Sequence, residues 1–371
     1  MPSKRKTSRR DFLKGRAAAR AMQDLADQSG SQLEPPDSAG SEGHAPSYLV
    51  QISRRAMAVE FQVYLNAGQH PDAPEVALAA LDLVETLENQ MTVFRGDSEL
   101  SAINRRAADE TVAVEPRLFA LFEQALNLSA ETQGAFETTT GPLSEVWGFH
   151  RRQGRFPDEN DVRQALDTVG SQWVELDAEN RTIRFRKPGV EINLNAIGKG
   201  YALDRCTEML RDAGVDDFLI HGGQSSILAA GSRSRADGPT KGWSVALRHP
   251  LRPDKRMAEI WLRDRALGTS GSGVQFFHYK GRRYGHVLDP RTGWPAEGVL
   301  SATVIAPTAA QADALATAFY VMGLDKAERY CADHEELSAI LACPGERSGS
   351  VAIHPIGLEN EDWVQLDPQS P

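Results

Sequence analysis

The sequence has few cysteines and no long apolar run. Its 371 residues include Cys206, Cys331 and Cys343, whose spacing fits neither a metal site nor a disulfide framework, so buried or idle thiols are the simplest interpretation. No apolar stretch approaches the roughly 20 residues that a membrane-spanning helix needs. A net charge of −10 also argues against nucleic acid as a partner. These absences leave a globular protein of one large domain or two modest ones.

The charge is uneven, and the N-terminal end is basic. Residues 1–20 carry eight Lys or Arg and one Asp, which leaves −17 on the rest of the chain. The stretch TSRRDFLKG resembles a twin-arginine export signature. However, Arg16, Arg20 and Asp24 interrupt the apolar segment that an export signal needs behind it. We therefore interpret residues 1–25 as a basic segment with a degenerate twin-arginine-like motif, and expect a cytoplasmic location, with the periplasm as the alternative.

Composition indicates where the folded part begins and ends. Residues 26–47 are polar and rich in Gly, Ser and Pro, which is typical of a flexible linker. We expect one folded domain over residues 48–355. The acidic residues 356–371 are expected to be a frayed tail.

Hydrophobic periodicity predicts both strands and helices. Alternation over 59–65 predicts a half-buried strand, and a helix after Pro74 is indicated by one apolar stripe, Leu81, Val84, Leu87 and Met91. Further helices are expected after Pro116, over 198–214 and over 311–323. A hairpin is expected over 173–187, and strands near 217–223, 225–231, 243–249, 258–264 and 300–306. Because strands occur in groups with helices between them, we predict an α+β fold with a mostly antiparallel sheet and packed helices.

Lys199 stands between two glycines in EINLNAIGKG, where the chain is expected to leave a strand and enter a helix. The free N–H groups and partial positive charge of a helix N-terminus attract anions, and Gly198 and Gly200 let a ligand approach the backbone. With the lysine charge added, the segment predicts a phosphate site, although it is neither a Walker A loop nor a G-x-G-x-x-G loop. The alternative is a surface lysine on a tight turn.

A second candidate is the helix expected after Thr308, which begins with a capping box completed by Gln311. Asp313 and Thr317 are four residues apart, so they lie one above the other on one helix face. A carboxylate and a hydroxyl near a helix start suit Mg²⁺, a hard cation that takes oxygen ligands and shares them with phosphate. The alternative is an Asp that favours the helix dipole and a Thr that bonds back to its own helix.

His286 precedes the tight-turn sequence DPRTG, in which Pro290 sets φ and Gly293 supplies a positive φ. A histidine held beside such a turn is a candidate general base or phosphate contact. The alternative is an ordinary hairpin with a hydrogen-bonded histidine.

Three further stretches combine glycine with hydroxyl or aromatic side chains: HGGQSSILAAG (221–231), LGTSGSG (267–273) and GAFETTTGPLSEVWGF (134–149). Paired glycines at a strand end allow close backbone contact. Aromatic rings can stack on a flat ring system, and they can equally pack in the core. For Phe136, Trp147 and Phe149, burial in the core is the simpler interpretation.

Together and in this order, these stretches resemble the ApbE family of FAD:protein FMN transferases. The matching blocks run from about Met57 to Gly323 and are MTVFRGDSELSAIN, GAFETTTGPLSEVWGF, NAIGKGYALD, GGQSS, TSGS, HVLDPRTG and ADALATA. The resemblance implies an ApbE-like, T-fold-related architecture and a Mg²⁺-dependent enzyme. Such an enzyme transfers the FMN part of FAD to a Thr or Ser hydroxyl of a target flavoprotein and releases AMP.

The resemblance also implies roles for individual residues. Asp313 and Thr317 would hold the metal with the backbone carbonyl of Ala196. Lys199 would contact the FAD diphosphate, and His286 would bind FAD and take the proton of the target hydroxyl; both would be catalytic. The remaining FAD-contacting residues would be Met57, Phe94, Ala135, Phe136, Glu137 and Asn193.

Three of these positions depart from the family pattern. Asn193 stands where Asp is usual, and its amide cannot carry that charge. Glu137 also replaces a usual Asp and is one methylene longer. Phe94 replaces a usual Tyr, so it keeps the ring and loses the hydroxyl. We expect FAD binding to survive all three changes, and their effect on the transfer rate is left open by the sequence.

Two other functions stay open from the sequence. A Mg²⁺-dependent FAD pyrophosphatase would use water in place of the target hydroxyl and release FMN and AMP. A non-catalytic FAD-binding protein would need neither metal nor base, and the presence of Asp313, Thr317, Lys199 and His286 argues against it. Acceptors in the family are often subunits of membrane redox complexes or flavin-carrying reductase domains, and the sequence names none of them.

Overall fold

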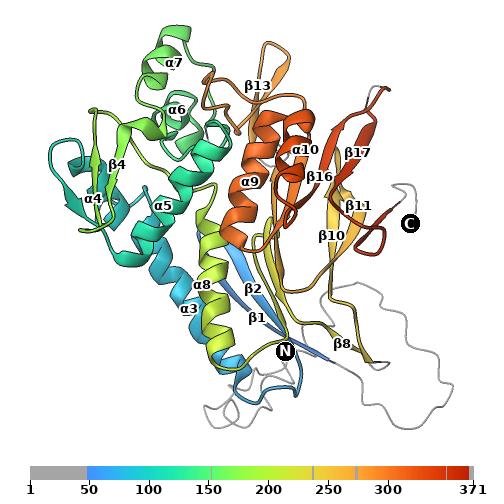
Figure 1. Cartoon of the computed structure of the whole chain (residues 1–371). Coiled ribbons are helices and arrows are strands. Elements are labelled where there is room, and N and C mark those ends of the chain that lie inside the picture. The colour runs from blue at the N-terminus through green and yellow to red at the C-terminus, as the bar shows by residue number, and fades with distance from the viewer. Residues whose placement is uncertain (1–47, 152, 236–237, 272–274, 348, 367–371) are drawn as a thin grey trace, which may run out of the picture. The chain divides into compact units, whose positions relative to one another are not determined.

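Figure 1 shows the computed structural model, which describes residues 48–151, 153–235, 238–271, 275–347 and 349–366. The basic segment and the linker predicted before residue 48 lie outside this part of the chain. They stay predictions, as does the expected cytoplasmic location. Within the described residues, none of the helices combines the length and apolar character that a membrane span requires.

An antiparallel sheet of eight strands lies at the centre of the described domain, in the order β1-β2-β6-β7-β12-β15-β16-β17. Every neighbouring pair in it is antiparallel. Its strands are β1 (Leu49–Ala56), β2 (Val59–Asn66), β6 (Phe218–Gly222), β7 (Ser226–Ala230), β12 (Arg265–Gly271), β15 (Ser301–Ala306), β16 (Ser338–Pro344) and β17 (Val351–Ile356). The predicted α+β class with a mostly antiparallel sheet is confirmed.

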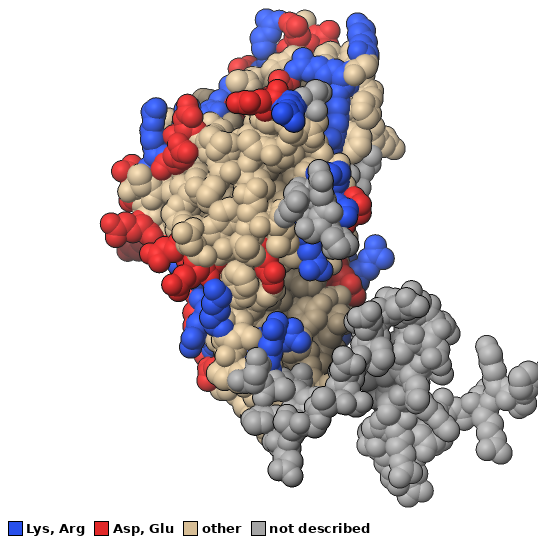
Figure 2. All heavy atoms as spheres, turned by 90° about the vertical axis from the view of Figure 1, so that its right-hand side faces the viewer, with Lys and Arg blue, Asp and Glu red and all other residues tan. Residues whose placement is uncertain are grey.

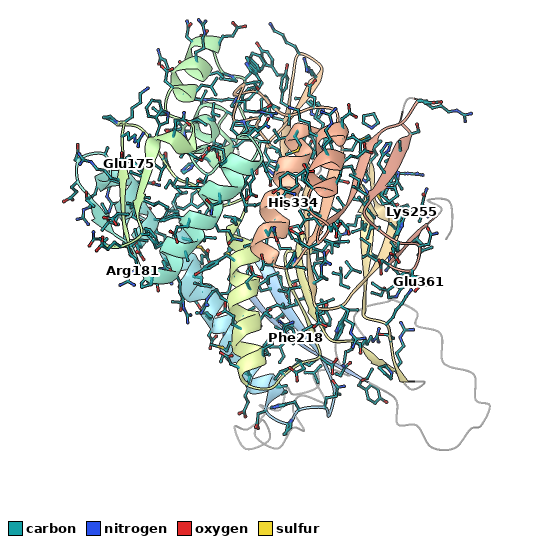
Figure 3. All side chains as sticks on the ribbon, in the orientation of Figure 1. Glu175, Arg181, Phe218, Lys255, His334 and Glu361 are labelled. Atoms are coloured by element: carbon teal, nitrogen blue, oxygen red, sulfur yellow. The ribbon has the colours of Figure 1, made fainter. Side chains whose placement is uncertain are left out.

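Helices cover one face of this sheet, and a smaller sheet covers the other (Figure 1). The helix layer contains α3 (Ala73–Met91), α8 (Gly198–Asp212) and α9 (Ala309–Met322). The smaller sheet has the order β10-β11-β18 and consists of β10 (Trp243–His249), β11 (Arg252–Leu262) and β18 (Trp363–Gln365). Because both faces are covered, β6, β7 and β15 are buried along their whole length. Phe218, labelled in Figure 3, is fully buried in the core on the helix side.

Shorter elements complete the domain. The other helices are α4 (Glu99–Arg106), α5 (Pro116–Glu131), α6 (Gly141–Val146), α7 (Glu159–Leu166) and α10 (Leu324–Ala332), with single 3-10 turns at Phe149–Arg151 and Ser171–Trp173. The other strands are β3 (Val112–Ala113), β4 (Val174–Asp177), β5 (Thr182–Phe185), β8 (Ser234–Arg235), β9 (Gly238–Pro239), β13 (Phe276–Tyr279) and β14 (Arg282–Gly285). The hairpin predicted over 173–187 is β4-β5, extended by β3.

Local signals account for most helix and strand limits. The apolar stripe predicted on α3 is buried, and β2 buries Phe61, Val63 and Leu65 as its alternation predicts. Thr308 caps α9 by accepting a hydrogen bond from the Gln311 N–H at 3.3 Å, which confirms the predicted helix start. Gly214 follows α8 with φ at +78°, a conformation that favours glycine after a helix.

One expectation is wrong. The tail is not frayed throughout, because Trp363–Gln365 forms β18 and pairs with β11. Residues 267–271 of the LGTSGSG stretch form the end of β12 inside the main sheet, where close backbone contact was expected. Its small residues have a packing reason: a Cβ at Gly268 would lie 2.4 Å from the carbonyl oxygen of Ala312 on α9. The close helix therefore selects glycine where strand propensity alone would not.

Figure 2 shows the face on the right of Figure 1. A broad central area of it carries no Lys, Arg, Asp or Glu, and charged side chains of both signs surround that area. On this face, the charged side chains therefore lie at the margins.

Candidate active site

The site is built where α8 crosses α9. A Cβ at Gly200 would lie 2.0 Å from the carbonyl oxygen of Ala309, so only glycine allows the two helices to approach this closely. The residues of α9 are buried on nearly every side of the helix. A polar side chain on this helix therefore faces protein and needs partners there.

Asp204 on α8 holds the start of α9. Its two carboxylate oxygens accept hydrogen bonds from the N–H groups of Ala309 and Ala310, at 2.7 and 2.9 Å. These N–H groups have no partner inside their own helix. Burial raises the pKa of Asp204 to about 7, against the effect of the two N–H donors. Sequence reasoning missed this residue, although it closes the block NAIGKGYALD.

Asp313 lies inside the crossing with only 6% of its side chain exposed. Its Oδ2 accepts hydrogen bonds from the Gly200 N–H at 2.9 Å and the Ser226 hydroxyl at 2.7 Å. The Lys199 Nζ stands 3.9 Å from the same oxygen. Burial raises the pKa of Asp313, while Lys199, Ser226 and Gly200 oppose the rise. The structure thus brings together the two charged residues that the sequence singled out on separate helices.

Three oxygen atoms at the crossing are available to a cation. Asp313 Oδ1 accepts no hydrogen bond from the described residues, since all the contacts of that carboxylate end on Oδ2. The carbonyl oxygen of Ala196 also accepts none from them, because the N–H of Gly200 is turned to Asp313 instead. Thr317 Oγ1 is the third atom, 2.9 Å from the Ser270 hydroxyl and 3.3 Å from the Asp313 carbonyl.

This donor set fits a hard divalent cation. It consists of one carboxylate and neutral oxygens, which suits Mg²⁺ shared with a phosphate better than a cage made by protein alone. The described residues contain no group of three or more His, Cys, Asp or Glu placed to hold a metal. Phosphate oxygens would therefore have to supply the remaining ligands.

His286 follows β14 and is held by the base of the β13-β14 hairpin. Its backbone N–H donates to the Gln275 carbonyl at 3.2 Å, and its Nδ1 lies 3.1 Å from the same oxygen. Because a carbonyl only accepts, Nδ1 carries the proton and Nε2 keeps its lone pair. Burial lowers the pKa of His286, and the Lys199 charge lowers it further, against the effect of the Gln275 bond. The His286 ring is therefore uncharged at neutral pH, and its Nε2 can accept a proton.

The DPRTG turn makes His286's surroundings rigid. The Gly293 N–H donates to the Asp289 carbonyl at 2.8 Å, and Gly293 has φ at +77°, as predicted. Asp289 pairs with Arg291 at 2.8 Å. The buried Trp147 indole donates to the Gly293 carbonyl at 2.8 Å, which ties the turn to the aromatic core.

Three residues predicted to contact FAD are not brought to an open surface. Ala135 is 1% exposed, Phe136 is fully buried and Glu137 is 7% exposed. Both Glu137 oxygens are occupied by donors from the backbone and hydroxyls of three residues, Ser129, Thr139 and Ser171. In this structure these positions support the core, as a fully partnered buried carboxylate and a packed ring do.

The other predicted FAD contacts lie in loops. Met57 occupies the two-residue turn between β1 and β2 with φ at +49° and is half-buried. Phe94 is 59% exposed, and its ring lies 4.9 Å from that of His150. The Asn193 side-chain oxygen accepts from the Asn195 N–H at 2.9 Å, while its own N–H donates to the Thr138 carbonyl. The uncharged Asn193 therefore shapes the loop that leads to Lys199.

Asn104, the last residue of the SELSAIN stretch, supports that same loop. Its side chain exchanges two hydrogen bonds with the backbone of Ile192, both at 2.9 Å. The sequence alone did not predict this supporting contact of Asn104.

Comparison with known proteins identifies the family of this chain. The family model described as "ApbE family" matches residues 56–341, most of the described domain. The chain belongs to the ApbE family. The FAD:protein FMN transferase of Treponema pallidum is 31% identical over 311 residues, covering 80% of this chain and 86% of the relative. That of Haemophilus influenzae is 28% identical over 289 residues, covering 75% and 82%.

Solved ApbE structures share the fold. The ApbE protein from Thermotoga maritima superposes with a TM-score of 0.74 at 28% identity, covering 83% of this chain and 97% of that one. The flavin transferase ApbE from Vibrio cholerae gives 0.73 at 25% identity, covering 84% and 98%. The ApbE-like architecture expected from the sequence is confirmed.

Proposed function

We propose that this protein is an FAD:protein FMN transferase, which moves the FMN part of FAD to a Thr or Ser hydroxyl of a target flavoprotein and releases AMP. The observation that supports it most is the crossing of α8 and α9, where Lys199 stands 3.9 Å from the buried Asp313. A cation site beside an ammonium group is what binding a diphosphate requires. The relatives named as such transferases support the same reaction.

Mg²⁺ is part of this proposal. Asp313, Thr317 and the carbonyl of Ala196 would hold it, since these residues present the oxygen atoms that have room for a further partner. When bound, it would offset negative charge on the FAD diphosphate. The buried Ser226 and Gly200 contacts keep the Asp313 carboxylate in one orientation, so the site needs little rearrangement.

The protein's own groups would bind, orient and move a proton. Lys199 would hold the diphosphate and stabilise the charge that develops on the leaving AMP. The acceptor oxygen forms a bond to the FMN phosphorus while the phosphorus–oxygen bond to AMP breaks. The hydroxyl proton passes to Nε2 of His286, whose other nitrogen is fixed by Gln275. Positioning of the reacting atoms would supply most of the rate.

One experiment separates this function from its alternatives. The protein is incubated with FAD, MgCl₂ and an acceptor domain that carries an Asp/Ser-Gly-Ala-Thr/Ser peptide, and flavin fluorescence on the acceptor is followed together with FMN and AMP. Covalent flavin on the acceptor with equimolar AMP supports the transferase. FMN and AMP without labelled acceptor would indicate a pyrophosphatase, and unchanged FAD a binding protein.

A further inference from the structure

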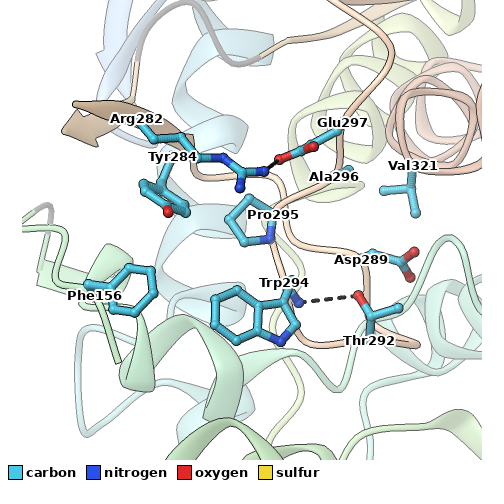
Figure 4. A pocket seen from close by; sticks show the side chains of 10 residues that line it. All are labelled: Phe156, Arg282, Tyr284, Asp289, Thr292, Trp294, Pro295, Ala296, Glu297 and Val321. Atoms are coloured by element: carbon cyan, nitrogen blue, oxygen red, sulfur yellow. Dashed lines mark hydrogen bonds and ion pairs between the residues drawn. The ribbon is translucent and has the colours of Figure 1, made fainter. Parts of the chain in front are cut away.

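A recess adjoins the chain segment that carries His286. A cavity of about 560 Å³ opens between the β13-β14 hairpin and the segment from Asp289 to Glu297 (Figure 4). Phe156, Tyr284 and Trp294 supply aromatic walls. The volume is in the range of ligand-binding cavities in proteins.

The cavity lies near His286 and is formed by other residues than those implied for FAD or the metal. His286 lies in the short segment between two lining residues, Tyr284 and Asp289. Val321, also in the lining, follows Thr317 by one turn of α9, so it continues the face that carries Asp313. The cavity is therefore available to a second partner near His286.

The β13-β14 hairpin beside the cavity is basic and aromatic, whereas the cavity wall itself carries two acidic side chains, Asp289 and Glu297. Residues 276–285 contain Lys280, Arg282 and Arg283 and no Asp or Glu, in a chain whose net charge is −10. Arg282 lies over the Tyr284 ring, 5.5 Å from its centre, and pairs with Glu297 (Figure 4). Phe276 and Tyr279 on the same hairpin are 42% and 37% exposed. Asp289 pairs with Arg291 and Glu297 with Arg282, so a partner with acidic groups would match the hairpin rather than the cavity wall.

The hairpin also offers backbone groups. Among the described residues, β13 and β14 pair only with each other. An extended polypeptide can add to such an edge through main-chain hydrogen bonds while its side chains enter neighbouring pockets. A flat dinucleotide has no such backbone to offer.

We propose that this cavity and the β13-β14 hairpin bind the segment of the acceptor polypeptide that carries the target hydroxyl. The segment docks in extended conformation, with an acidic residue near the hydroxyl opposite Arg282. This assignment rests on the proposed transferase function, because only that reaction needs a polypeptide at His286.

The first test measures transfer to two synthetic ten-residue peptides, each with one threonine between glycine and alanine. One peptide has flanking aspartates, and the other has asparagines in their place. Ala296→Trp fills the cavity, Arg282→Glu reverses the charge at its mouth, and Arg282→Glu with Glu297→Arg restores the ion pair in reversed order. Ala178→Trp and Arg181→Glu at the β4-β5 turn are matched controls, and Arg181 lies far from β13 (Figures 1 and 3).

We expect KM for the aspartate peptide to rise about tenfold or more in the cavity variants, with FAD affinity within about twofold of wild type. The double variant, Arg282→Glu with Glu297→Arg, should keep the raised KM. If Arg282 acted only by pairing with Glu297, the double variant would restore the wild-type KM. Arg282→Glu should also remove the preference for the aspartate peptide. If the cavity variants match the controls, or if the swap restores KM, the docking assignment is wrong.

The second test maps the docking site without transfer. The threonine of the aspartate peptide is replaced by a photoreactive benzoylphenylalanine, and the peptide is irradiated with the FAD-loaded wild-type protein. Crosslinks within residues 282–297 support the assignment. Crosslinks elsewhere, or none beyond those of a scrambled peptide, would overturn it. Crosslinks at the cavity without flavin transfer to the threonine peptide would keep the docking site and contradict the transferase function.

Discussion

The crossing of α8 and α9 and the cavity beside β13-β14 both lie near His286 and are built in opposite ways. At the crossing, the buried Asp313 and the half-buried Asp204 receive hydrogen bonds from backbone groups more than a hundred positions away. At the cavity, ion pairs such as Arg282–Glu297 lie at the surface and aromatic rings line an open space. The groups proposed to perform chemistry are thus held by packing, while the groups proposed for recognition stay accessible.

The difference follows from what each task requires. Buried charges are costly unless their partners are in place, so the crossing tolerates one arrangement of its polar groups. That constraint is an advantage where a metal and a diphosphate must be aligned. Exposed ion pairs contribute little to stability, and a surface of this kind can change without unfolding the protein. Substitutions at six positions would sharpen or break this comparison.

The largest effect is expected at Asp313. Asp313→Ala removes the only carboxylate among the proposed metal ligands, so Mg²⁺-dependent release of AMP from FAD should fall by more than about 100-fold. The measurement is AMP formed against Mg²⁺ concentration. Asp325→Ala on the exposed side of α10 serves as the control. Normal Mg²⁺ activation in Asp313→Ala would rule out the metal assignment.

His286 is expected to come next. His286→Gln should slow transfer by about 10²-fold or more, as loss of a general base does, while His354→Gln should not. Only the neutral ring accepts a proton, so wild-type activity is present above the pKa of His286 and lost as the pH falls through it. Burial and Lys199 place that pKa below the ordinary value of 6.5.

The pH profile gives a sharper version of the same test. In Lys199→Met the neighbouring charge is gone, so the acidic limb of the remaining activity should move to higher pH. A wild-type limb at or above pH 6.5, or an unchanged limb in Lys199→Met, would show that His286 is not the group that titrates.

Gly200→Ala tests the packing of the crossing. Its methyl group would meet the Ala309 carbonyl at 2.0 Å, so α8 and α9 must move apart. We expect a loss of about 1–3 kcal/mol in the free energy of unfolding, together with weaker Mg²⁺ activation. Thermal unfolding and AMP release measure the two effects. Gly96→Ala is the matched control, because its nearest neighbour would be 4.0 Å away. Equal behaviour of the two variants would mean that the close approach is unnecessary.

Asp204 should give a smaller, graded effect. Asp204→Ala leaves two N–H groups of α9 without an acceptor and should lower stability by about 1–2 kcal/mol. Asp204→Asn keeps one acceptor oxygen and should lose less. If Asp204 positions α9, the Mg²⁺ concentration for half-maximal activity should rise in the order wild type, Asn, Ala. Stability loss without that rise would limit Asp204 to a structural role.

The smallest effect is expected at the cavity mouth. Arg282→Ala breaks an exposed ion pair, so the melting temperature should stay at the wild-type value within the error of the measurement. A fall like that of Gly200→Ala would show that the hairpin contributes to the fold, and the contrast between the two regions would be lost.

Sequence reasoning succeeded where the signal is local. The Thr308 cap, the glycine after α8 and the one-turn spacing of Asp313 and Thr317 all involve residues within a few positions of one another. It could not reach contacts that a distant neighbour decides. Burial of Phe136 was the simpler interpretation from the sequence and is confirmed, whereas the hydrogen bonds of Glu137 to Ser129 and Ser171 depend on how other elements pack around it. Local pattern does not show which side of a loop faces the core.

By itself, the sequence determined the types of the elements, their caps and the chemistry available on each. Only the tertiary structure decided that Lys199 of α8 meets Asp313 of α9, and that Asp204 and Ser226 complete the contact. The physical reason is that this meeting depends on two helices packing at a glycine, Gly200. A glycine in the sequence indicates only that close approach is possible, and the folded chain determines what approaches it.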